Sequence, residues 1–142
     1  MFAEDQRVLI AETDPGLRRD LSAGLREGGI LSDRVRNADH LLRSLVENHY
    51  VAVVLDTGLS GGTTEEILQV IRGLPPSRRP IVLVVFEGET PRELDAETVQ
   101  ILVRKPYGVK ELTAVIRGCL EFQRRMISLG AGGMEEQAPK NV

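Results

Sequence analysis

Four polar side chains stand directly after apolar stretches of the sequence, and their types suit them to metal or phosphate chemistry. Glu12 and Asp14 follow the stretch RVLIA, Asp56 ends the stretch VAVVLD, and Lys105 comes just past VQILV. Carboxylate oxygens are the hard ligands that Mg²⁺ takes, whereas a lysine ammonium supplies a mobile positive charge for phosphate. A fold that gathers these residues would therefore form a site for a divalent cation or a phosphoryl group.

The elements that must position these residues are indicated by the apolar stretches themselves. Residues 7–11, 51–56, 80–86 and 99–103 are β-rich with little polar alternation, and a weaker strand at 30–35 alternates more, as is typical of a sheet edge. Strands that are apolar on both faces belong in a parallel sheet covered by helices. Because segments with helical spacing separate the strands, the sequence predicts an α/β fold with a doubly wound, five-stranded parallel sheet. Functional groups in such a sheet gather beyond the carboxyl ends of the strands.

Two helix starts are marked by capping residues. Asp14, with a proline after it, is typical of a helix N-terminus, and Thr63 with Glu66 fits a capping box. The segment at 87–98 has only a brief helical pattern, begun by a Thr-Pro pair, so we expect any helix there to be short.

Length and composition predict a single domain. The chain has 142 residues, of which 42% are hydrophobic and 27% charged, enough for one sizeable core. The last helix is expected to run to about residue 129. Residues 130–142 are rich in glycine and polar residues without a period, so we predict a domain at 1–129 and a disordered tail or linker stump at 130–142.

The same composition argues against several classes of protein. The net charge is −3 and the basic residues are scattered, which disfavours direct nucleic-acid binding by this domain. No apolar run reaches membrane-spanning length and the N-terminus does not resemble a signal peptide, so we expect no membrane association and a cytoplasmic location. The single cysteine, Cys119, lies among apolar residues and is expected to be a small buried hydrophobe.

Four motifs give residues 7 to 122 a resemblance to the receiver domains of two-component response regulators: LIAETDP, VVLDTGLSGG, PIVLVV and VRKPY. The resemblance implies a (βα)5, flavodoxin-like domain with strand order 2-1-3-4-5. It implies that Asp56 is the phosphoacceptor and that Lys105 contacts the phosphoryl group. It also implies that Gly58 lends its backbone carbonyl to Mg²⁺ and that Pro106 fixes the next turn, usually through a cis bond.

The metal site departs from the family pattern. Thr13 stands where the family normally has the second of two adjacent acids, which binds Mg²⁺ directly. A neutral hydroxyl in place of a charged ligand lowers the affinity for a hard cation. We therefore expect a weak or absent Mg²⁺ site at Glu12, Asp56 and Gly58, with Asp14 as a further candidate ligand.

Two switch positions also differ. Val85 stands where the family usually has a threonine or serine that hydrogen-bonds the phosphoryl oxygen, and such a bond to a charged group contributes about 1.5 to 3 kcal/mol. Leu102 stands where a switch aromatic often lies. Without these groups, the usual coupled movement of hydroxyl and aromatic ring is not expected.

Two functions remain open on these residues. One is a signal-transduction receiver that accepts a phosphoryl group on Asp56 from a histidine kinase or phosphotransfer protein and modulates protein–protein interaction. The other is a phosphorylation-independent pseudo-receiver that acts as a binding or dimerisation module. We expect the domain not to be an enzyme, with self-catalysed phosphoryl transfer to Asp56 impaired. A homodimer through the mixed-charge face at 87–117 is compatible with both. A cofactor-binding flavodoxin is disfavoured because the first turn, AETDPG, is acidic.

Overall fold

The computed structural model describes residues 6–92 and 94–137, with side chains as far as residue 129. Five parallel strands form one sheet in the order β2-β1-β3-β4-β5, which confirms the expected fold class and strand order. The strands are β1 (Arg7–Ala11), β2 (Ser32–Arg34), β3 (Tyr50–Asp56), β4 (Ile81–Phe86) and β5 (Ile101–Arg104). The weak second strand lies at one edge, as its alternation predicts.

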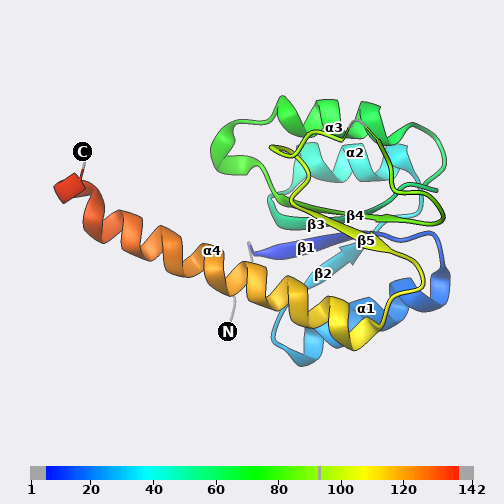
Figure 1. The fold of residues 1–142 in the computed structure, drawn as a ribbon, viewed down its shortest axis with the longest axis horizontal. Coiled ribbons are helices and arrows are strands. Elements are labelled where there is room, and N and C mark those ends of the chain that lie inside the picture. Colours follow the sequence, from blue (N-terminus) through cyan, green and yellow to red (C-terminus); the bar gives the residue numbers. More distant parts are fainter. Residues whose placement is uncertain (1–5, 93, 138–142) are drawn as a thin grey trace.

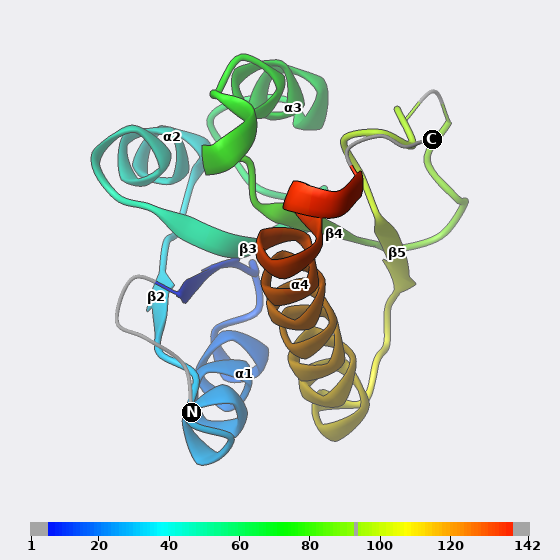
Figure 2. The same cartoon turned by 90° about the vertical axis from the view of Figure 1, so that its left-hand side faces the viewer.

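Helices cover both faces of this sheet (Figure 1). α1 (Pro15–Glu27) and α4 (Val109–Gln137) pack beside each other on one face, and α2 (Ala38–Glu47) and α3 (Thr64–Arg72) pack on the other. A short 3₁₀ helix, Pro76–Arg78, precedes β4. In Figure 2, α4 points toward the viewer with α1 beside it, and the sheet separates this pair from α2 and α3.

The core has two layers because successive strand residues point to opposite faces. Val53 and Leu55 belong to the apolar cluster under α2 and α3, whereas Ala52 and Val54 belong to the cluster under α1 and α4. All four are almost completely buried. This double burial explains why β3 is apolar at nearly every position, and it places Asp56 at the carboxyl end of the central strand.

Both predicted helix starts are confirmed. The Asp14 side chain accepts hydrogen bonds from the backbone N–H groups of Gly16 at 2.8 Å and Leu17 at 3.1 Å. Thr63 and Glu66 form the reciprocal capping box of α3. Asp14 therefore has a structural task at the start of α1.

The connection between β4 and β5, for which the sequence allows at most a short helix, forms no helix among its described residues, 87–92 and 94–100. Side chains hold it in turns instead. The Arg104 guanidinium donates to the backbone carbonyl of Gly88 and to the Thr90 hydroxyl, and Asp95 accepts from the Thr98 hydroxyl at 2.7 Å. Such local bonds compete with helix formation. Without a covering helix, Leu102 on β5 stays 43% exposed.

The last helix is longer than the sequence predicts. α4 continues to Gln137 instead of ending near residue 129. Glycines lower helix propensity, but extending an existing helix avoids the cost of nucleation. The rest of the predicted tail, residues 138–142, lies outside the described residues. Figure 1 shows that the second half of α4 projects away from the sheet.

Cys119 is only partly buried on α4, so the expectation of a buried thiol is wrong. Its neighbour Val115 is 42% exposed, because this side of the helix turns away from the sheet. The partial burial still raises the pKa of the thiol.

In the part of the chain that the structure describes, no helix is both long enough and apolar enough to cross a membrane.

Candidate functional site

The structure brings three of the four predicted site residues into contact. Glu12 follows β1, Asp56 ends β3 and Lys105 follows β5, so all three lie at the carboxyl edge of the sheet. The Lys105 ammonium lies 2.6 Å from a Glu12 oxygen and 2.7 Å from an Asp56 oxygen. Glu12 is completely buried and Asp56 is 4% exposed. The three side chains form a buried ion triad.

The Asp56 carboxylate accepts hydrogen bonds on both oxygens. Oδ2 accepts from the Thr13 hydroxyl at 2.7 Å, from the Thr13 backbone N–H at 3.1 Å and from Lys105 at 2.7 Å. Oδ1 accepts from the Gly58 backbone N–H at 2.9 Å. Burial opposes ionisation of Asp56, but the hydrogen bonds from Lys105, Gly58 and Thr13 outweigh it and hold the pKa of the carboxyl well below its usual range.

Lys105 stays charged between its two carboxylates. Burial lowers the pKa of its ammonium, but the hydrogen bonds and the attraction of Asp56 and Glu12 raise it above the ordinary lysine value. Its peptide bond to Pro106 is cis, as the family resemblance implies.

Glu12 has a partner that the sequence reasoning missed. The Tyr107 hydroxyl donates to Glu12 Oε1 at 2.6 Å, while Oε2 accepts from Lys105 and from the Asp14 backbone N–H at 2.9 Å. Burial and the bond to Glu12 raise the pKa of the Tyr107 hydroxyl, so it remains a proton donor. The only signal in the sequence was the position of this tyrosine, two residues after the lysine.

These contacts do not fit a magnesium site. The oxygens of Glu12 and Asp56 are already bonded to N–H, O–H and ammonium donors, and Asp14 caps α1. Thr13 adds a hydroxyl that donates to Asp56 where a further negative ligand would be needed. Among the described residues, no three or more His, Cys, Asp or Glu side chains are grouped to hold a metal ion.

The side of the pocket toward β4 is apolar. The strand register pairs Asp56 with Val85, which has no hydroxyl to offer the pocket. The Val85 side chain is completely buried in the core. Phe86, the next residue, is 4% exposed and lies under the Arg104 guanidinium, whose centre is 4.9 Å from the ring centroid. The Arg104 guanidinium is held by this ring and by its hydrogen bonds to Gly88 and Thr90 in the connection to β4.

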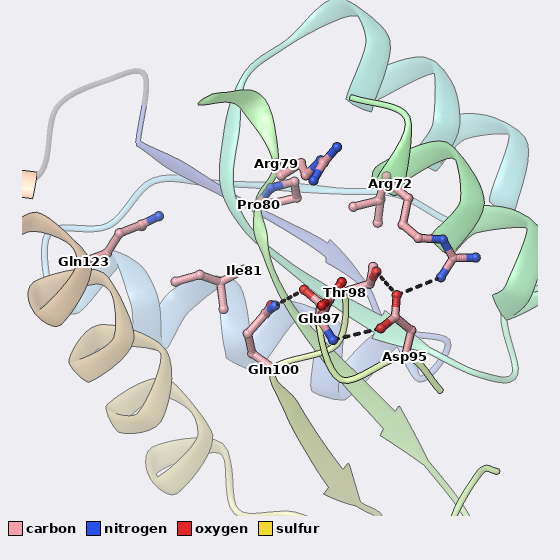
Figure 3. Close-up of a pocket in the computed structure, with 10 residues that line it drawn as sticks. Arg72, Arg79, Pro80, Ile81, Asp95, Glu97, Thr98, Gln100 and Gln123 are labelled. Carbon is pink, nitrogen blue, oxygen red and sulfur yellow. Dashed lines mark hydrogen bonds and ion pairs between the residues drawn. The ribbon is translucent and has the colours of Figure 1, made fainter. Parts of the chain in front are cut away.

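A separate hollow of about 420 Å³ lies at the opposite end of β4, beside Pro80 and Ile81 (Figure 3). Its polar wall is a local network in which Asp95 accepts from Arg72, from the Thr98 hydroxyl and from the Glu97 backbone N–H. None of the predicted site residues lines this hollow. Arg72 and Asp95 form an ion pair, and Asp95 also accepts from two groups of the connection between β4 and β5.

Comparisons with known proteins agree with the fold. No family model matches the chain. The two-component response regulator PhoP of Pseudomonas aeruginosa is 28% identical over 116 residues, which cover 80% of this chain and 51% of PhoP. The chain thus spans about half the length of this curated relative.

Three solved structures match over nearly their whole length. A sensor protein from Polaromonas sp. JS666 is 25% identical with a TM-score of 0.69, covering 82% of this chain and 96% of its own. A CheY-like response regulator receiver domain protein from Methanospirillum hungatei JF-1 is 18% identical with a TM-score of 0.72, covering 85% and 98%. An orphan response regulator of H. pylori is 21% identical with a TM-score of 0.63, covering 80% and 94%.

Proposed function

Since this chain is a receiver domain of the kind found in two-component response regulators, we propose that it signals by protein–protein interaction without phosphorylation, as a pseudo-receiver. The observation that carries the proposal is the state of Asp56. Its Oδ2, the oxygen that faces Lys105, already accepts three hydrogen bonds, two of them from Thr13. The hydrogen-bonding positions of this oxygen are therefore occupied by groups of this chain.

Charge in the pocket supports the same proposal. Glu12 and Asp56 carry two negative charges, and Lys105 supplies the positive charge that bridges them. A phosphoryl group on Asp56 would replace one negative charge with about two in a buried place. Without a bound divalent cation and without a hydroxyl at Val85, that added charge would have few partners, and unpaired buried charge is costly.

One observation favours a second function, that of a working phosphoacceptor. The lysine ammonium lies 2.7 Å from the Asp56 carboxylate, as phosphoryl transfer to this residue would require. In that reaction an Asp56 oxygen would form a bond to phosphorus while the bond from phosphorus to the donor histidine nitrogen breaks, and the electron pair would leave with the imidazole. The partner would be a histidine kinase or a phosphotransfer protein.

Amide NMR on labelled protein distinguishes the two functions. Mg²⁺ is added first, followed by beryllofluoride as a phosphoryl mimic. We expect the resonances of Gly58 and Lys105 to stay unchanged in the wild type, because the oxygens of the pocket are already occupied. In the double variant Thr13→Asp/Val85→Thr, which restores a charged ligand and a hydroxyl, we expect both resonances to shift.

The opposite result identifies a phosphoacceptor. Wild-type shifts that begin at Asp56 and are abolished by Asp56→Asn would overturn the pseudo-receiver proposal and favour the second function. If the resonances shift in neither the wild type nor the double variant, then more than these two positions separates the pocket from an active one. The pseudo-receiver proposal would stand in that case. The absence of enzymatic activity and the cytoplasmic location both stay predictions.

A further inference from the structure

The projecting half of α4 carries a row of exposed apolar side chains. Phe122 is 60% exposed, Met126 48% and Leu129 62%, and Val115 nearer the domain is 42% exposed. The half-buried Cys119 lies between them in the sequence. Exposed apolar side chains scattered singly need no explanation, but a continuous row on one helix does.

The spacing of this row is that of a coiled-coil seam. From Val115 to Leu129 the steps along the chain are four, three, four and three residues. This repeat of 3.5 residues brings the same side of a helix back against a partner helix turn after turn. Between residues 115 and 129, no charged residue falls at a position of the seam.

The seam is distinct from the side of α4 that packs on the sheet. Leu112, Ile116 and Leu120 are buried in the core cluster under α1 and α4. At 3.6 residues per turn, the centre of the seam lies about a quarter of a turn around the helix from these residues. A partner helix can therefore pack on the seam without displacing the domain.

No other described element of this chain covers the seam. Gln123 still lines the hollow beside Pro80 and Ile81. The C-terminal part of α4 extends past the sheet, as Figure 1 shows. An isolated helix of this length is marginal in water, and most helical stability comes from packing an apolar face. The outer half of α4 thus has the length and the pattern of a helix whose stabilising contact is supplied by another molecule.

We propose that this partner is a second copy of the chain, bound as a parallel, two-fold coiled coil along Val115, Cys119, Phe122, Met126 and Leu129. The seam suits itself, because two-fold symmetry sets each of these apolar residues opposite a like residue and opposes no charge at the seam. The flanking positions support close approach, since Gly118 and Gln123 are uncharged and Arg125 is the only charged one among the described side chains.

The parallel orientation follows from where the domains sit. In a parallel pair the two projecting helices run beside each other over their whole length, and both domains lie at the same end. In an antiparallel pair, the last turns of each helix would run against the partner's domain. The seam spans only about two heptads, so the dimer should be weak and dependent on protein concentration.

This inference does not depend on the state of the Asp56 pocket, and its test uses no metal or phosphoryl mimic. The first measurement is sedimentation velocity of the full chain over a range of concentrations. We expect a shift from monomer to dimer as concentration rises. Phe122→Glu places like charges opposite each other in the seam, and we expect it to raise the dissociation constant by roughly thirtyfold or more.

A matched control carries the same charge on the other side of the helix. Ser128 is exposed and points away from the seam, so Ser128→Glu should leave the dissociation constant within about threefold of the wild type. Both substitutions are at exposed positions, and circular dichroism checks that both variants fold. An equal effect of the two substitutions would overturn the seam as the contact.

Disulfide cross-linking tests the register. In a Cys119→Ser background, Met126→Cys should cross-link rapidly to the same residue of the second copy under mild oxidation, whereas Arg124→Cys, on the outer side, should not. A chain that stays monomeric at millimolar concentration, or cross-linking at 124 as fast as at 126, would overturn the proposal. Cross-linking at neither position despite a dimer would overturn the parallel seam.

Discussion

The Asp56 pocket and the outer half of α4 differ in where their side chains find partners. In the pocket, each carboxylate oxygen of Glu12 and Asp56 accepts at least one hydrogen bond from the same chain. On α4, the side chains of Phe122, Met126 and Leu129 are between 48% and 62% exposed. The comparison indicates that the acidic residues of this fold can be bonded within one chain, while the apolar side chains that are available to a partner lie on another surface.

The largest effect on stability is expected when the positive charge of Lys105 is removed from the pocket. Lys105→Met leaves two buried carboxylates facing each other without their bridge, and we expect a loss of about 3 to 5 kcal/mol in the free energy of unfolding. Urea denaturation measures it. Lys110→Met, at an exposed position on α4, is the matched control and should change stability by less than about 0.5 kcal/mol. Equal effects would mean that the triad is not a structural network.

Acid should weaken the pocket in a way that depends on Asp56. The pKa of its carboxyl is lowered in the folded chain, so its contribution is present above the pKa of the unfolded chain and is lost as pH falls toward the folded value. We expect the difference in unfolding free energy between the wild type and Asp56→Asn to shrink below about pH 4, near the ordinary aspartate pKa. A difference that grows with acidity would contradict the internal pairing of Asp56.

Thr13 makes a smaller contribution to the pocket. Thr13→Val keeps the shape of the side chain but removes the hydroxyl that donates to Asp56. Because Thr13 is exposed and water can replace part of the bond, we expect a loss of about 1.5 kcal/mol, at the low end for a hydrogen bond to a charged group. Thermal unfolding beside the control Thr64→Val measures the difference. A variant as stable as the control would show that the hydroxyl is not needed to close the pocket.

The smallest effect is expected at the seam of α4. In dilute monomer, Phe122→Ser should change the free energy of unfolding by less than about 0.5 kcal/mol. Ile116→Ala, six residues earlier but completely buried, should cost about 2 to 5 kcal/mol. Denaturant titration of both variants at low protein concentration provides the comparison. A large loss from Phe122→Ser in the monomer would place the exposed row in the domain core.

Much of the fold could be predicted from local signals. Strand residues such as Val53 and Val54 are apolar because both faces of the sheet are covered, and that pattern is visible without a structure. The caps at Asp14 and Thr63 are equally local. The strand order came from the family resemblance, because apolar stretches alone do not specify which strands lie side by side.

The rest depended on contacts between distant parts of the chain. Tyr107 binds Glu12, which lies 95 residues earlier, and no spacing rule links two such positions. The segment around Thr90, where at most a short helix was expected, is held instead by the Arg104 side chain of the following strand, which binds Gly88 and Thr90. The extension of α4 past residue 129 depended on a helix already nucleated in the domain, which outweighed the local preference of its glycines.

The short link between the pocket and α4 has a mechanical consequence. Tyr107, which holds Glu12, is two residues before Val109, where α4 begins. With 29 residues, α4 is a rod about 43 Å long. The first half of this rod is fixed in the core by Leu112, Ile116 and Leu120. A partner bound to the projecting half is therefore joined to Tyr107, and through it to Glu12, by one continuous helix and a single intervening residue.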